Sequence, residues 1–186
     1  MRIAVSGTHC SGKSTLVEDF AAAHRDYVHE PEPYEWLADL YGEDFSESPD
    51  ANDFHRQLEL CVERLSGYAR GARVIAERSP LDFLAYMLAL GDLGRGGRSS
   101  RLVASAIELA ARGMEHVDLL VVLPLVEADG IVAPESEDLD LREAMNDRLL
   151  EIVSADEHQL LGNVRAIEVH GARRARLAAL ERAMRQ

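Results

Sequence analysis

The sequence predicts one α/β domain over residues 1–186, with a five-stranded parallel sheet flanked by helices. Three observations predict this fold. Five short, β-branched apolar runs alternate with helical patterns along the chain. These runs do not alternate cleanly between apolar and polar residues, which is typical of strands covered on both faces. A glycine-containing loop joins the first strand to the first helix, and the length suits a single domain.

The strands and their order follow from the same pattern. Because strands that alternate with helices form right-handed βαβ units, we expect a parallel sheet in the order 2-3-1-4-5. The expected strands are Arg2–Val5, Tyr27–His29, Arg73–Ala76, Leu119–Leu123 and Val164–Val169.

Helices are expected between the strands. Ser79-Pro80-Leu81-Asp82 is a strong helix start, with serine at the N-cap, proline at N1 and a carboxylate at N3. Apolar stripes predict one helix that contains Leu16 and Phe20 and another that contains Phe54 and Leu65. Further helices are expected near 102–112, 139–153 and 174–184. The arginines after Gly171 are predicted to form a solvated face opposite the apolar one.

Composition excludes several classes of partner. The chain has 33 acidic and 20 basic residues, a net charge of −13, so a nucleic-acid partner is not expected. No segment approaches the roughly 18 apolar residues of a membrane helix, and the first residues do not resemble a signal peptide. We therefore expect no membrane partner and a cytoplasmic location. Cys10 and Cys61 are too few for a disulfide framework. The sequence leaves the oligomeric state open, a homodimer included.

Residues 7–14 read GTHCSGKS and match the phosphate-binding pattern G-x-x-x-x-G-K-S/T, with a predicted strand before and a predicted helix after. The two glycines allow backbone amides to turn around phosphate oxygens. Lys13 is the only lysine of the chain, and its compact charge suits the β- and γ-phosphates of ATP. The hydroxyl of the next residue, Ser14, suits Mg²⁺. The predicted nucleotide site comprises Gly7, Thr8, His9, Cys10, Ser11, Gly12, Lys13, Ser14 and Thr15.

His9 and Cys10 occupy variable positions of this pattern, and we interpret them as loop residues rather than as a catalytic pair.

Two carboxylates follow the second strand. Glu30 and Glu32 each precede a proline, which holds both in extended geometry. In a doubly wound sheet, ligands bind outside the carboxyl ends of the strands, so either could accept a proton from an attacking hydroxyl. Glu30 is favoured because it lies closer to the strand end; the choice between the two stays open.

The third strand ends in Glu77 and Arg78. The carboxylate could hold Mg²⁺ through water, and the guanidinium could stabilise charge on the transferred phosphate. The alternative is a Glu–Arg ion pair that only tethers the strand to its helix. Ser79 and Asp82 are interpreted as helix caps.

These motifs resemble those of P-loop kinases that act on small molecules. GTHCSGKST, the Glu-Pro element and ERSPLDFLAY are similar to the AAA-type ATPase/kinase family that includes the ribosylnicotinamide kinase domain, with a relation to deoxynucleoside kinases. The resemblance implies a P-loop fold, a small lid at about 128–153, and Mg·ATP-dependent phosphorylation of a small-molecule hydroxyl. It also implies that the glutamate after the second strand is the base and that Arg78 orients the acceptor.

The lid departs from the family pattern. In the family an arginine follows an Asp-Gly pair, whereas Asp129-Gly130 is followed here by Ile-Val-Ala. The nearest arginines are Arg142 and Arg148. Six residues on one helix correspond to about 600°, so the two cannot share a face. We favour Arg142 for the phosphates.

The acceptor class is suggested by charge. Residues 30–53 contain nine acidic residues and no lysine or arginine, which favours a neutral or cationic nucleoside-like acceptor. A solvated acidic loop remains the alternative interpretation.

Another class of function also remains: an ATP- or GTP-binding regulatory module without an acceptor. With its one lysine inside the phosphate loop, the chain has no N-K-x-D run for reading guanine, which weakens the GTPase version. An assembly-forming ATPase would need Asp-Glu after the strand at 119–123, where Pro124 follows instead.

Overall fold

Five parallel strands form one sheet in the order β2-β3-β1-β4-β5, as the sequence predicts. The computed structural model describes the chain except residues 39–41, 43–48, 96–99, 157 and 186. Each strand lies within one or two residues of its expected position. Their bounds are β1 Arg2–Ser6, β2 Val28–Glu30, β3 Val74–Glu77, β4 Leu119–Val122 and β5 Arg165–Glu168.

The helices also form where their patterns predict them. The last helix begins and ends within a residue of its expected bounds, and the two before it extend two residues beyond theirs at one or both ends. Their bounds are α1 Lys13–Ala23, α2 Pro33–Trp36, α3 Ala51–Ser66, α4 Pro80–Asp92, α5 Ser100–Met114, α6 Leu139–Ala155 and α7 Arg173–Ala183. A short 3₁₀ turn, η2, covers Glu127–Asp129.

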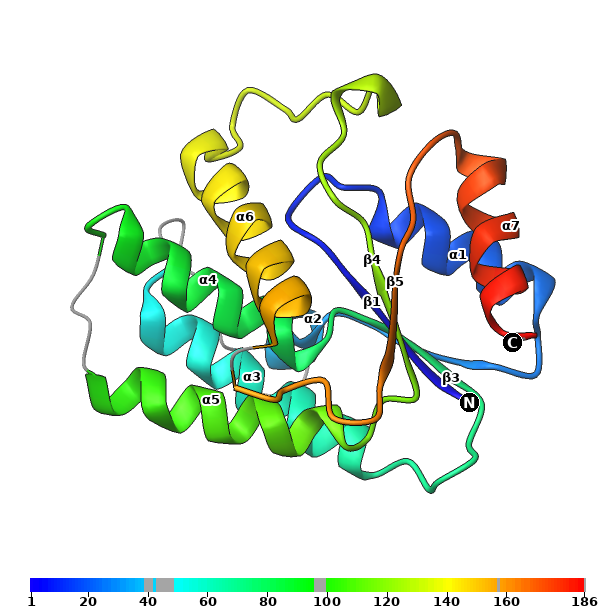
Figure 1. Cartoon of the computed structure of the whole chain (residues 1–186), viewed down its shortest axis with the longest axis horizontal. Coiled ribbons are helices and arrows are strands. Elements are labelled where there is room, and N and C mark those ends of the chain that lie inside the picture. The colour runs from blue at the N-terminus through cyan, green and yellow to red at the C-terminus, as the bar shows by residue number, and fades with distance from the viewer. Residues whose placement is uncertain (39–41, 43–48, 96–99, 157, 186) are drawn as a thin grey trace.

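The sheet is covered on both faces, which is why its strands are continuously apolar. Along β1, Ile3 and Val5 belong to the core that α1 and α7 close, together with Phe20 and Leu180. Ala4 points to the other face and joins the core formed with α3, α4, α5 and α6. Figure 1 shows this division, with α1 and α7 together on one side of the strands and the other long helices on the opposite side.

The segment expected to form a lid has two structural parts. Residues 128–138 comprise the end of η2 and an irregular stretch that leads to α6. Helix α6 buries Leu141, Met145 and Leu149 in the core that it shares with α4. Figure 1 shows the irregular stretch above the carboxyl ends of the strands. Of the expected lid, only this irregular stretch lies outside the packed helical layer.

No helix in the described part of the chain combines the length and the apolar character that a bilayer-spanning helix needs. Cys10 and Cys61 are both free thiols.

One glycine is required by close helix packing. A Cβ at Gly113 of α5 would lie 2.6 Å from Pro80 of α4 and 2.6 Å from Val62 of α3. We expect Gly113→Ala to lower the free energy of unfolding by about 1–3 kcal/mol, the usual cost of overpacking. Urea denaturation measures it. Gly67→Ala is the control, because Gly67 has helical dihedrals and its Cβ would come no closer than 3.3 Å to its neighbours. Equal midpoints for the two variants would contradict the prediction.

Candidate functional site

The phosphate-binding loop lies at the carboxyl end of β1 and runs directly into α1. Its two glycines have positive φ angles, 152° at Gly7 and 92° at Gly12. A Cβ at Gly7 would lie 2.7 Å from Ser11 Oγ and 2.8 Å from the carbonyl oxygen of Leu123. The tight turn and the close approach both require glycine at this position.

Every carbonyl from residue 7 to residue 11 accepts a hydrogen bond from a cationic side chain. Arg78 donates to Gly7 O at 3.2 Å, and Lys13 donates to Thr8 O at 2.9 Å. Arg142 donates to the carbonyls of residues 9 and 10, at 2.9 and 3.2 Å, and Arg176 donates to that of residue 11 at 2.7 Å. Because the C=O and N–H of a trans peptide point in opposite directions, each contact turns the following amide away from its cation. The amide of residue 9 donates to the Tyr86 hydroxyl at 3.1 Å. Amides that a loop turns inward bind phosphate oxygens.

Asp82 fastens the loop to the start of α4. The Ser79–Asp82 capping box forms as the sequence predicts. The buried Asp82 carboxylate also accepts from the amide of Gly7 at 2.9 Å and from the Ser6 hydroxyl at 2.6 Å. One side chain thus caps α4 and fixes the first residue of the loop, and the cap pattern alone did not reveal this second contact.

Arg78 is a buried cation with a strained backbone. Its φ is 76°, uncommon for a residue with a side chain, and strain of this kind gathers at functional sites. Its Nε donates to Glu32 Oε2 at 2.9 Å, and its ion-pair partners are Glu32 and Asp82 rather than Glu77. Burial would lower the pKa of Arg78, but its interactions with the carboxylates of Glu32 and Asp82 and with Tyr86 outweigh burial and raise it. Its buried Nη2 has no hydrogen-bond partner among the described residues.

Lys13 and Glu32 face each other beside this guanidinium. Lys13 Nζ lies 3.8 Å from Glu32 Oε1. Burial, helped by the nearby Arg78, lowers the pKa of Lys13 to about 8. Burial acts to raise the pKa of Glu32, but the charges of Arg78 and Lys13 outweigh it and lower that pKa. The carboxylate is therefore held ionised between two cations.

Glu77 and Ser14 form the neighbouring pair. Ser14 Oγ donates to Glu77 Oε1 at 2.5 Å. Burial is the main cause that raises the pKa of Glu77, and the charge of Glu32 adds to it. A hydroxyl and a carboxyl oxygen are the hard ligands that Mg²⁺ prefers. In the described ranges no group of three or more His, Cys, Asp or Glu could hold a metal. An ion here would take its other ligands from phosphate and water, as Mg²⁺ commonly does.

Glu30 lies in a different set of contacts. Its carboxylate accepts from Trp36 Nε1 at 2.7 Å, from Arg64 Nε at 2.9 Å and from the Tyr68 hydroxyl at 2.5 Å. The Arg64 guanidinium also stacks 4.0 Å over the Trp36 ring. Sequence position favoured Glu30, yet the structure brings Glu32 to Lys13 and Arg78, and it turns Glu30 towards α3.

The two arginines of α6 diverge as their spacing predicts. Arg142 reaches the phosphate loop, whereas Arg148 pairs with Asp92 and Glu151. His9 of the phosphate loop contacts the stretch before α6: its Nδ1 lies 3.2 Å from Glu137 Oε1. Burial and the nearby cations lower the pKa of His9 to about 3, so its ring is neutral at pH 7.

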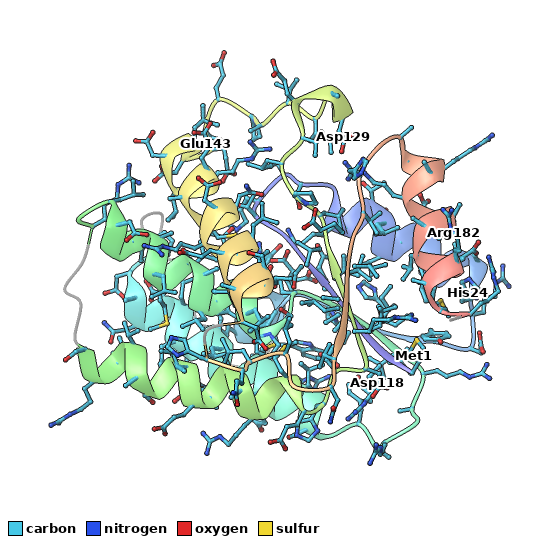
Figure 2. The ribbon with its side chains drawn as sticks, viewed as in Figure 1. Met1, His24, Asp118, Asp129, Glu143 and Arg182 are labelled. Carbon is cyan, nitrogen blue, oxygen red and sulfur yellow. The ribbon has the colours of Figure 1, made fainter. Side chains whose placement is uncertain are left out.

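A cavity of about 250 Å³ adjoins the loop on the side of α7. Its wall includes Gly12 and Thr15 from the loop and α1, Asp129 and Ile131 from the stretch after β4, and the start of α7. Figure 2 shows Asp129 on that stretch, at the carboxyl ends of the strands. The cavity is therefore continuous with the phosphate loop.

Arg176 corrects the prediction that the arginines after Gly171 are solvated. It is 5% exposed and contacts the phosphate loop, Gly171 and Asp129. Its spacing carried the missed signal: Arg176, Leu180 and Ala183 lie at i, i+4 and i+7 on the buried face of α7.

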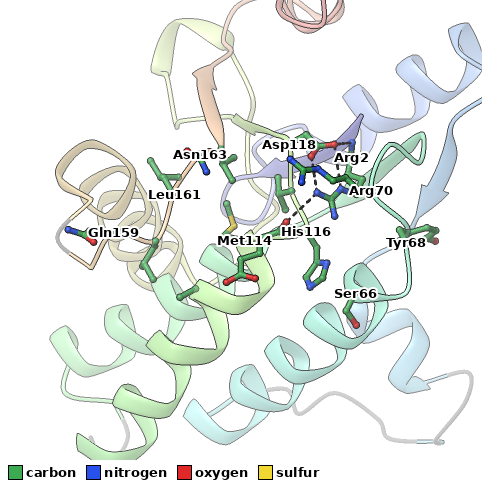
Figure 3. Close-up of a pocket in the computed structure, with 16 residues that line it drawn as sticks. Arg2, Ser66, Tyr68, Arg70, Met114, His116, Asp118, Gln159, Leu161 and Asn163 are labelled. Atoms are coloured by element: carbon green, nitrogen blue, oxygen red, sulfur yellow. Dashed lines mark hydrogen bonds and ion pairs between the residues drawn. The ribbon is translucent and has the colours of Figure 1, made fainter.

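A wider cavity, of about 830 Å³, lies at the opposite end of the sheet. Figure 3 shows Arg2 and Asp118 in its wall, at the amino ends of β1 and β4. Ligands of open parallel sheets bind at the carboxyl ends of the strands, so this cavity is separate from the phosphate-loop site. Tyr68 lines it and, through its hydroxyl, touches Glu30.

Comparisons with known proteins agree with this fold. Several solved structures share it. Deoxyadenosine kinase from M. mycoides with bound dATP is 14% identical, with both chains covered in full and a TM-score of 0.71. Thymidylate kinase from Candida albicans is 15% identical over 98% of this chain and 90% of its own, with a TM-score of 0.69. NadR protein in complex with NAD and AMP-PNP is 16% identical over 98% of this chain but 48% of its own, with a TM-score of 0.59.

At these identities the likeness to solved structures shows the P-loop fold. No curated protein sequence matches the chain. A family model described as an AAA domain matches residues 2–169, from β1 to the residue after β5. The chain therefore belongs to this AAA-domain family.

Proposed function

We propose that the protein is a Mg·ATP-dependent kinase that transfers the γ-phosphate of ATP to a hydroxyl group of a small molecule. One observation carries the proposal: Glu32 is held ionised between Lys13 and Arg78, directly beside the phosphate loop. A phosphate loop alone serves switches and transporters as well as kinases. An ionised carboxylate fixed next to it is what an acceptor hydroxyl requires, and a regulatory module without an acceptor has no need of it.

The donor would occupy the loop and the adjoining cavity. The inward amides of the loop would bind the β-phosphate, and Lys13 would leave Thr8 O to contact the γ-phosphate. The 250 Å³ cavity on the α7 side is the place for the donor base. Ser14 and Glu77 would hold Mg²⁺, which neutralises charge on the β- and γ-phosphates when bound.

Glu32 would accept the hydrogen bond of the attacking hydroxyl and take up its proton. Its lowered pKa makes it a weak base. Phosphoryl transfer passes through a loose transition state in which little covalent chemistry falls to the protein, so orientation of the hydroxyl is the larger contribution. Arg78 fixes the carboxylate and places positive charge near the transferred group.

The acceptor side is marked by two buried donors that have no hydrogen-bond partner within the described part of the chain. Arg78 Nη2 is one, and Gln57 Nε2 of α3 is the other. Gln57 shares a helix face with Phe54, which stacks on Tyr86, and with Cys61, which lines a small cavity together with Arg78. Unsatisfied buried donors are costly, and an acceptor with oxygen or nitrogen lone pairs would satisfy them.

We propose that this acceptor is a neutral or cationic nucleoside-like molecule. In the described part of the acceptor side, Glu32 and Glu30 are both paired with cations. Of the nine acidic residues on which the charge argument rests, Asp39, Glu43, Asp44 and Glu47 lie outside the described residues.

The stretch 128–138 and Arg142 would act as the lid. Arg142, in the first turn of α6, donates to the loop carbonyls of residues 9 and 10, next to the place where the phosphates would bind. Closure over the nucleotide would exclude water, which otherwise competes with the acceptor hydroxyl.

The activity can be tested by ³¹P NMR with Mg·ATP and a panel of nucleosides, nicotinamide riboside and amine-bearing natural products. We expect a new phosphomonoester signal that is absent with Lys13→Ala, because that variant lacks the cation for the β- and γ-phosphates. ATP bound but unchanged with every member of the panel would favour the regulatory alternative. A preference for nucleoside monophosphates would contradict the acceptor class.

Glu32→Gln tests the orientation of the acceptor hydroxyl. We expect kcat to fall roughly 100-fold or more at a temperature where the variant is folded, the usual contribution of a positioned acid–base group. The melting temperature should fall as well, because Lys13 and Arg78 lose the carboxylate that they share. Steady-state kinetics with the acceptor identified above measures kcat. Activity retained to within a few-fold would exclude Glu32 as the base.

Glu30→Gln should lower stability without a comparable loss of kcat. Because Glu30 accepts from three side chains, we expect the free energy of unfolding to fall by roughly 1–3 kcal/mol. The fluorescence of Trp36, the only tryptophan, should shift at the same time. The exposed Glu35 of α2 provides the control variant Glu35→Gln, for which neither change is expected. A large loss of kcat with unchanged stability would return the base to Glu30.

A further inference from the structure

We propose that Arg176 is a positioning residue for the donor nucleotide: with Asp129 as its partner, it holds the phosphate loop in its binding shape from the far end of the chain. The proposal rests on the proposed function, because it assumes that the loop binds a triphosphate. Neither residue belongs to the phosphate-binding motif at residues 7–14.

The contacts of Arg176 join three separate segments. Its Nη1 donates to Ser11 O in the phosphate loop at 2.7 Å. Its Nε donates to Gly171 O, before α7, at 2.8 Å. Its Nη2 donates to Asp129 Oδ2, on the stretch after β4, at 2.6 Å. All three donors lie in the plane of one rigid guanidinium, so the relative positions of the three segments are fixed together.

Asp129 completes the joint. Its other oxygen, Oδ1, accepts from the amide of Gly171 at 2.8 Å. The side chains of Arg176 and Asp129 are only 6% and 5% exposed. A buried ion pair of this kind contributes little net stability over apolar packing, but loss of one partner leaves the other buried and unpaired. In this position the ion pair serves to fix the relative positions of the three segments.

The loop is shaped to receive Arg176. A Cβ at Gly12 would lie 2.5 Å from Arg176 Nη1. The glycine of the motif therefore gives room for the guanidinium as well as for phosphate. Contact at Ser11 O turns the next amide, that of Gly12, to the inside of the loop, where a phosphate oxygen binds.

Arg176 also lines the 250 Å³ cavity assigned to the donor base. Each of its three guanidinium nitrogens already donates one hydrogen bond, to Gly171, Ser11 or Asp129. The base of a bound nucleotide would contact the edge or face of the guanidinium, which would keep its hydrogen bond to the loop. The positioning role and a direct base contact therefore make different predictions for a ligand that has phosphates but no base.

The test measures the binding of ATP and of inorganic tripolyphosphate to the whole chain by calorimetry, with Mg²⁺ present. For Arg176→Met we expect both dissociation constants to rise by the same factor, roughly 10- to 100-fold, the range for loss of a hydrogen bond to a charged group. KM for ATP should rise similarly, and kcat should change less. Arg174→Met is the matched control, an exposed arginine on the same helix, for which we expect no change.

The other outcomes overturn the proposal. Weaker binding of ATP alone would show a direct contact with the base. A lower melting temperature with unchanged dissociation constants would show a role in stability only. Arg176→Lys and Asp129→Asn provide milder variants should Arg176→Met fold poorly, and each should weaken the two ligands equally. If the native protein binds tripolyphosphate but phosphorylates no acceptor, the proposed function fails while the positioning of the loop can still be judged.

Discussion

The hydrogen bonds that cationic side chains donate to five consecutive carbonyls, from Gly7 to Ser11, are the constraint on which the site depends. A loop of five peptide planes has many conformations, and only those with the amides turned inward form an anion-binding concavity. The chain fixes this conformation with cationic donors from four places: the residue after β3, and helices α1, α6 and α7. The loop is therefore formed by the whole α/β body rather than by its own sequence.

Those cations can lie close together because carboxylates lie among them. Lys13 and Arg78 share Glu32, Arg78 also faces Asp82, and Arg176 pairs with Asp129. Paired charges avoid most of the repulsion and desolvation that these cations would otherwise suffer. Burial lowers the pKa of His9 most, and the charges of the nearby cations lower it further. A chain with a net charge of −13 thus maintains a locally positive cradle for a polyanion.

The sequence was sufficient to predict the sheet, its strand order and the phosphate loop, because these depend on local patterns. Burial on both faces leaves continuous apolar runs, and the loop needs glycine and lysine at fixed spacing. The choice between Glu30 and Glu32 depended on how the chain turns after β2. Both precede proline, and only the start of α2 at Pro33 turns one towards Lys13 and the other towards Arg64. The second contact of Asp82 and the burial of Arg176 are long-range, so no local pattern could specify their partners.

The contact between Arg176 and the phosphate loop also bears on where the functional unit ends. The family match stops at residue 169, which is where the sheet is complete and where a boundary drawn from family resemblance would fall. Helix α7 begins four residues later. A protein shortened to the matched region would keep every residue of the phosphate-binding motif and every strand. It would lose the guanidinium that fills the space beside Gly12, so the proposed role of Arg176 places part of the nucleotide-binding unit outside the region that family resemblance recognises.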